Sequence, residues 1–178
     1  MAKKLLATQT ASSSSSLSFT TGIDSTYSVY EFHLVNMHPA TDNVGISFQV
    51  NASGGSGFNE TITSSYFRAW HSESDSSAAI GYNTTFDKAQ GTSYQHLISE
   101  VGNDNDQSTS GVLTLYGPSS TTYVKHFTSR MVEVWSADSA IENYSAGYIN
   151  TTSAIDEINF KFASGNIDAG TIKMYGVG

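Results

Sequence analysis

The sequence has no cysteine and few charged residues. The lack of cysteine excludes disulfide bonds, zinc–thiolate sites and thiol chemistry. Asp, Glu, Lys and Arg together make up 13% of the chain, about half the share of about 25% found in ordinary soluble domains. Acidic residues outnumber basic ones by 16 to 8, which gives a net charge of −8. Because such a surface repels phosphates, we expect neither nucleic acid nor an anionic membrane as a partner.

Long hydrophobic runs are also missing. No apolar stretch approaches the length of about 20 residues that a membrane-spanning helix needs. The first residues include Lys3 and Lys4, but the apolar run that follows is too short for a signal peptide. We therefore expect synthesis in a cytoplasm without a cleavable leader.

Serine, threonine, asparagine, glycine and aromatic residues dominate what is present, and apolar residues alternate with polar ones. Tyr30, Phe32 and Leu34 alternate with Glu31 and His33. This period of two is typical of strands with one buried and one solvated face. The same pattern predicts that Phe32, Phe48, Phe160 and Ile172 face the core. We predict strands at residues 5–10, 17–21, 27–36, 46–51, 61–70, 94–101, 112–116, 123–128, 131–135, 144–150, 158–162 and 171–174.

Many short strands separated by glycine-rich turns favour an all-β antiparallel sandwich, jelly-roll-like in its connections. Helical signals are weak, with one or two turns at most over residues 84–90. The length of 178 residues suits a single domain spanning residues 1–178. The serine run from Ser12 to Ser16 has two interpretations, a linker after an N-terminal arm or the loop of a hairpin, and we favour the hairpin.

The chain shows no signature of catalysis or of cofactor binding. A G-x-S-x-G nucleophile elbow, a phosphate-binding glycine loop and a histidine pair with metal-ligand spacing are all missing. Glu31 and Glu133 occupy alternating positions at which we expect them to face water. Residues 102–107 are predicted to form a polar turn, with a weak surface Ca²⁺ site as the alternative. We predict no enzyme, no catalytic residue, no metal and no cofactor. The five histidines, which are scattered singly, are His33, His38, His71, His96 and His126.

One aromatic cluster has two interpretations. Tyr66 and Trp70 lie in the segment YFRAWH, and Tyr82 follows after a polar stretch. Aromatic side chains of this kind stack on sugar rings and mark protein interfaces, but they also pack within sheets. Tyr66, Trp70 and Tyr82 are therefore the candidate ligand or interface residues.

Five motifs in order along the chain resemble a family of small virion structural proteins of marine tailed phages. They are TQTAS at residues 8–12, FTTGIDSTY at 19–27, HPATDN at 38–43, PSSTTYVK at 118–125 and GNIDAGTIKMYG at 165–176. The resemblance implies a β-sandwich protein of the particle with no catalytic residues to transfer. It also favours the hairpin interpretation of the serine run.

From the composition and the resemblance together, we expect a non-enzymatic capsid decoration or auxiliary coat protein at the virion surface. The alternative is a tail or head fibre module that binds a host-surface glycan, and a carbohydrate-active enzyme is the third hypothesis. Expected partners are the major capsid or other virion proteins and further copies of the chain, with a trimer implied by the resemblance and by particle symmetry. The apolar residues Ile172, Met174, Tyr175 and Val177 are predicted to form the last strand, near the contact.

Overall fold

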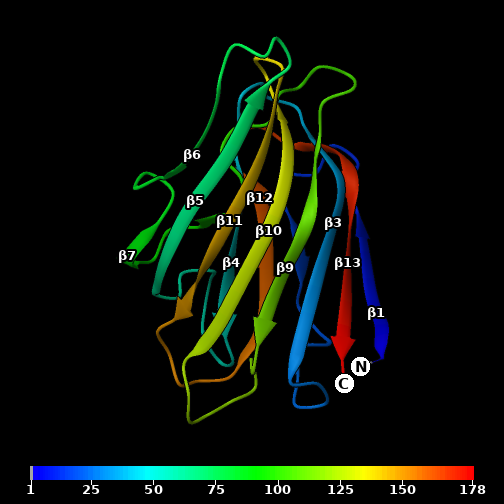
Figure 1. Ribbon diagram of the computed structural model, residues 1–178. Helices are drawn as coiled ribbons and strands as arrows, with labels where there is room; N and C mark the ends of the chain where they lie inside the picture. The colour runs from blue at the N-terminus through cyan, green and yellow to red at the C-terminus, as the bar shows by residue number, and fades with distance from the viewer. Residues whose placement is uncertain (1) are drawn as a thin grey trace.

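The alternating segments form strands that stack as two antiparallel β-sheets. The computed structural model describes residues 2–178, which contain thirteen strands and no helix. A helix able to span a membrane is accordingly not found in residues 2–178. The larger sheet lies in front of the smaller one in Figure 1, and the predicted β-sandwich is confirmed. Its jelly-roll connectivity stays a prediction.

The larger sheet has nine strands and the smaller sheet has four. The order in the larger sheet is β1 (Lys3–Thr10), β13 (Ile167–Val177), β3 (Val29–Pro39), β9 (Thr109–Tyr116), β10 (Lys125–Trp135), β11 (Ser139–Ile149), β5 (Ile62–Ser72) and β6 (Ala78–Tyr82), with β7 (Lys88–Gly91) also paired to β5. The order in the smaller sheet is β2 (Leu17–Phe19), β12 (Ile155–Phe162), β4 (Ile46–Ala52) and β8 (Gln95–His96).

One apolar core fills the space between the sheets. Phe32, Phe48, Phe160 and Ile172 are each 0% exposed, as the alternation predicts. The ring of Phe32 lies 5.6 Å from the ring of Phe160, and Phe19 packs against both. The alternation thus predicted correctly which face of these strands is buried.

Several strand boundaries differ from the prediction. Residues 123–128 and 131–135 belong to one continuous strand, β10, because Ser129 and Arg130 continue the pairing with β9 and β11. Only Gln95 and His96 of the predicted strand at residues 94–101 pair as β8. Residues 84–90 form no helix and instead lead into β7, and β6 was not predicted.

Strand β4 is buried on both faces, which the alternation did not predict. Ile46, Phe48 and Val50 face the core, yet Gln49 on the opposite face is also 0% exposed. Its side-chain amide donates hydrogen bonds to the carbonyl oxygens of Glu60 at 2.9 Å and Thr92 at 3.0 Å. The two connections that carry these carbonyls therefore cover the outer side of the smaller sheet.

The predicted N-terminal hairpin is wrong. β1 pairs with β13 in the larger sheet, whereas β2 pairs with β12 in the smaller one. The residues from Ser12 to Ser16 therefore carry the chain from one sheet to the other. Ser14 pairs with Ile167 at this corner.

The two ends of the described chain lie side by side. β1 runs antiparallel to the last strand, β13, and Lys3 is paired with Val177. The amide of Ala2 donates to the carbonyl oxygen of Gly178 at 3.0 Å, and the amide of Gly178 donates back to Ala2 at 3.3 Å. Residues 2 and 178 are therefore neighbours at this edge of the larger sheet (Figure 1).

Candidate binding surfaces

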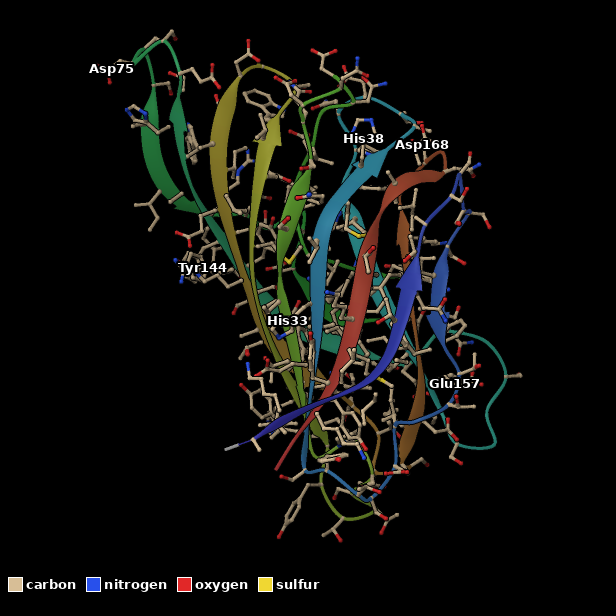
Figure 2. All side chains as sticks on the ribbon, turned by 90° about the vertical axis from the view of Figure 1, so that its right-hand side faces the viewer. His33, His38, Asp75, Tyr144, Glu157 and Asp168 are labelled. Carbon is tan, nitrogen blue, oxygen red and sulfur yellow. The ribbon has the colours of Figure 1, made fainter. Side chains whose placement is uncertain are left out.

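The larger sheet has one face turned away from the smaller sheet, which we call the outer face. Of the eight large hydrophobic residues that are exposed in residues 2–178, seven belong to its outward-pointing positions. Figure 2 shows one residue of this face, Tyr144, on the side of the molecule opposite Glu157 of β12. The seven are Leu5, Val35, Phe67, Ile80, Tyr82, Tyr116 and Val132.

The outer face is close to neutral although the chain is strongly acidic. Along the regularly paired part of the strands in residues 2–178, the outward-pointing carboxylates are those of Glu31 and Glu142. Glu31 accepts a hydrogen bond from the amine of Lys3 at 2.6 Å and lies 2.7 Å from the ring nitrogen of His33. Glu142 pairs with Arg130. Both carboxylates are thus compensated locally, and most of the net charge of −8 lies elsewhere.

An aromatic row crosses one end of the outer face. Tyr82 on β6 is opposite Phe67 on β5, and Phe67 is opposite Tyr144 on β11. The rings of Phe67 and Tyr144 stack with 4.8 Å between their centroids and an interplanar angle of 7°. The guanidinium carbon of Arg130 lies 5.8 Å from the centroid of the Tyr144 ring. Shallow hollows flank the exposed side chain of Val132 nearby.

A second feature lies on the opposite, inner side of the same sheet. A cavity of about 280 Å³, which we call the tryptophan cavity, opens where the ends of β5 and β10 meet the start of β11. Trp70 points inward two residues before the end of β5, and Trp135 ends β10; these are the two tryptophans of the chain. β5 and β10 both run antiparallel to β11, so their last residues lie at the same end of the sheet, beside the start of β11. The residues that line the cavity are Arg68, Trp70, Ser77, Trp135 and Ile141.

Hydrogen bonds hold both indole rings in place. The ring nitrogen of Trp135 donates to the side-chain oxygen of Asn43 at 2.7 Å, and that of Trp70 donates to the hydroxyl of Ser77 at 3.4 Å. The guanidinium carbon of Arg68 lies 5.5 Å from the centroid of the Trp70 ring. In residues 2–178, the Arg68 side chain makes no ion pair and no hydrogen bond.

The prediction that Glu133 faces water is wrong, because β10 turns this residue inward. Glu133 is 1% exposed, and burial raises the pKa of its carboxyl group. The hydroxyl of Ser99 donates to this carboxyl group at 2.5 Å, and the amide of Glu100 donates to both of its oxygens at 3.3 Å. Glu133 therefore fixes the connection after β8 beneath the sheet and offers no surface to a ligand.

The three candidate aromatic residues do not form one surface. Tyr66 is 0% exposed, and its hydroxyl donates to the side-chain oxygen of Asn143, so this side chain belongs to the interior. Trp70 lines the tryptophan cavity on the inner side. Tyr82 is 57% exposed on the outer face, and its hydroxyl donates to Asp87 at 2.6 Å. Trp70 and Tyr82 thus belong to two separate candidate surfaces.

The remaining polar candidates are dispersed. In residues 2–178 no group of three histidine or carboxylate side chains comes together in a way that could hold a metal ion. In the predicted polar turn at residues 102–107, Gln107 is 4% exposed, its amide donates to the carbonyl of Asp104 at 2.8 Å and its side-chain oxygen accepts from the Asp104 amide at 3.3 Å. His33 and His126 lie on the outer face.

Sequence reasoning missed Arg68 and Trp135 as partners of Trp70. Comparisons of the chain with protein-family models, with curated proteins and with solved structures find no match. The outer face and the tryptophan cavity therefore have to be interpreted from their own chemistry.

Proposed function

We propose that the protein is a non-enzymatic structural protein of a tailed-phage particle, a capsid decoration or auxiliary coat protein at the virion surface, which assembles with further copies of itself through the outer face. The observation that carries the proposal is the concentration of exposed apolar side chains on this nearly neutral face. The five motifs that resemble phage virion proteins support the viral part of the proposal.

A second copy of the chain is the occupant that the charge distribution favours. Two molecules with a charge of −8 each repel one another wherever their acidic loops meet. On the outer face the carboxylates are paired with Lys3 and Arg130, so two such faces can approach with little repulsion. Apolar patches on a soluble protein typically mark interaction surfaces.

The outer face is large enough for a stable contact. Strands spaced about 4.8 Å apart and rising about 3.3 Å per residue give this sheet a face of about 35 by 30 Å, or about 1,000 Å². A standard interface buries about 800 Å² on each partner. A second copy could therefore bury an area typical of specific complexes without using the sheet edges.

Light scattering on the purified full chain tests the assembly. Val132 is 51% exposed between the hollows of the outer face, so Val132→Glu places an uncompensated charge there beside Glu142. We expect the wild type to have the mass of two or more copies, with three implied by the resemblance, and Val132→Glu to shift toward the monomer. Ser153→Glu adds the same charge in an exposed loop next to the smaller sheet and should leave the mass unchanged.

Four results would count against the proposal. A wild type that is monomeric at all accessible concentrations would refute assembly, as would a Val132→Glu variant with the wild-type mass. A density map of the virion without a copy of this sandwich would refute the location. Turnover of a glycoside, ester or peptide that disappears on replacing one carboxylate or serine would refute the non-enzymatic role.

The second candidate function is a fibre module that binds a host-surface glycan. The tryptophan cavity favours it, because the two indole rings and Arg68 surround a space of about 280 Å³. This candidate uses the inner side of the sheet and is compatible with assembly through the outer face.

A further inference from the structure

We propose that the tryptophan cavity binds a sugar ring that carries a carboxylate, with Arg68 pairing the carboxylate and the two indole rings packing against the ring. This inference deepens the second candidate function, glycan binding, and is independent of assembly through the outer face.

The state of Arg68 points to an anionic group in the ligand. Arg68 is half-buried and stacks on Trp70, yet its guanidinium has no carboxylate within ion-pair distance in residues 2–178. The chain has twice as many acidic as basic residues, and its other arginine, Arg130, is paired with Glu142. A guanidinium presents a planar fork of N–H donors that matches a carboxylate in a bidentate arrangement. The cavity thus holds a guanidinium whose N–H donors make no direct bond in residues 2–178.

The indole rings favour a ligand that presents a flat face of C–H groups. The ring N–H groups of Trp70 and Trp135 are already donated to Ser77 and Asn43. What the rings offer the cavity is therefore their π-system, whose negative face attracts weakly positive C–H groups. A pyranose ring presents such C–H groups on its faces and hydroxyls around its edge. The hydroxyl of Ser77 accepts from Trp70, which leaves its own proton free to donate to a sugar hydroxyl.

The surrounding charge favours one carboxylate over a phosphate-rich ligand. The turns that border the cavity carry Glu73, Asp75 and Asp138, all exposed, and the amide of Glu73 donates to the carbonyl of Asp138 at 2.9 Å. These carboxylates repel a polyanion such as a nucleic acid, whereas a single carboxylate held by Arg68 meets one compensating charge. A cavity of about 280 Å³ also has room for one sugar ring rather than for a protein segment.

Intrinsic fluorescence of the full chain tests the proposal directly, because both tryptophans line the cavity and the protein has no others. The probe is D-glucuronate, with D-glucose as the neutral match and adenosine monophosphate as an aromatic anion, each at matched ionic strength. We expect a saturable change in emission with glucuronate. We expect glucose and adenosine monophosphate to bind at least about tenfold more weakly, as the loss of a charge-assisted hydrogen bond or added repulsion requires.

Variants identify the groups responsible. Arg68→Gln should weaken glucuronate binding at least about tenfold, since it removes a charged hydrogen-bond donor. Lys4→Gln, which removes a positive charge from an exposed side chain on β1 at the other edge of the same sheet, should leave the affinity unchanged. Arg68 also stacks on Trp70, so Arg68→Lys serves as a second variant that keeps the charge and should retain a preference for glucuronate over glucose.

Each contrary result has a distinct meaning. Equal affinity for glucuronate and glucose would overturn the carboxylate assignment and leave glycan binding standing, whereas no response to any sugar would overturn both. Tighter binding of adenosine monophosphate than of glucuronate would replace the sugar with a nucleotide. Loss of binding in Lys4→Gln as large as in Arg68→Gln would refute the role of Arg68. None of these outcomes depends on the oligomeric mass, which tests assembly separately.

Discussion

Replacing Phe160 by alanine should remove a central contact of the sandwich. Phe160 is 0% exposed, and its ring lies 5.6 Å from Phe32 and 6.4 Å from Phe19. Phe-to-Ala substitutions in cores cost about 3–5 kcal/mol, because burial is lost and a cavity is left. Each aromatic pair adds about 0.5–1.5 kcal/mol, so we expect Phe160→Ala to fall in the upper part of that range. A domain of this kind has a total stability of about 5–15 kcal/mol, so a loss of about 5 kcal/mol removes from about a third of it to nearly all of it.

Urea denaturation followed by circular dichroism measures the effect. The midpoint for Phe160→Ala should fall strongly while the slope with urea stays constant, since the change affects stability and not the surface exposed on unfolding. Phe160→Leu keeps most of the apolar volume and should lose less than half as much, which provides a result if the alanine variant does not fold. A loss below about 1 kcal/mol for Phe160→Ala, against the value of about 3–5 kcal/mol for a buried ring, would mean that the strand faces are reversed.

Two further predictions concern buried positions. The raised pKa of Glu133 means that the folded state holds this proton more tightly than the unfolded chain does, so its stabilising contribution is present below the ordinary value of 4.5 and is lost as the pH rises through the raised value. The stability of Glu133→Gln relative to the wild type should therefore increase from acidic to neutral pH in urea titrations, and a constant difference would contradict the raised pKa of Glu133. A Cβ on Gly176 would collide with the ring of Tyr27, so Gly176→Ala should show a loss of about 1–3 kcal/mol in a thermal melt. Gly81→Ala, where nothing lies within 4 Å, should be neutral or slightly stabilising in the same thermal melt, and equal losses in both variants would refute the close packing of Tyr27.

The alternation of apolar and polar residues predicted the inward face wherever one side of a strand is solvated. It worked for Phe32 and Ile172 because the outer face of their sheet is open. It failed at Gln49 because connections far along the chain cover the second face of β4, which no local pattern encodes. It failed at Glu133 because a carboxylate was assumed to require water, whereas Ser99 and a backbone amide satisfy it internally.

Strand pairing explains what was missed at the candidate sites. Trp70 and Trp135 are the last residues of two predicted strands, but their meeting depends on both strands pairing with β11. A sequence pattern gives strand positions and leaves the order of strands in a sheet open. The serine run was misassigned for the same reason, because a hairpin and a crossover between sheets use similar residues.

Because Ala2 and Gly178 are hydrogen-bonded to one another, the chain could be circularly permuted without disturbing the sheets. A linker of a few glycines across these ends would allow the polypeptide to be opened elsewhere, for example between Gly54 and Gly55 in the exposed turn after β4. By the same geometry, the whole sandwich could be spliced into a surface loop of an unrelated scaffold, entering and leaving at nearly one point. Such grafting would present the outer face and the tryptophan cavity on a carrier of choice.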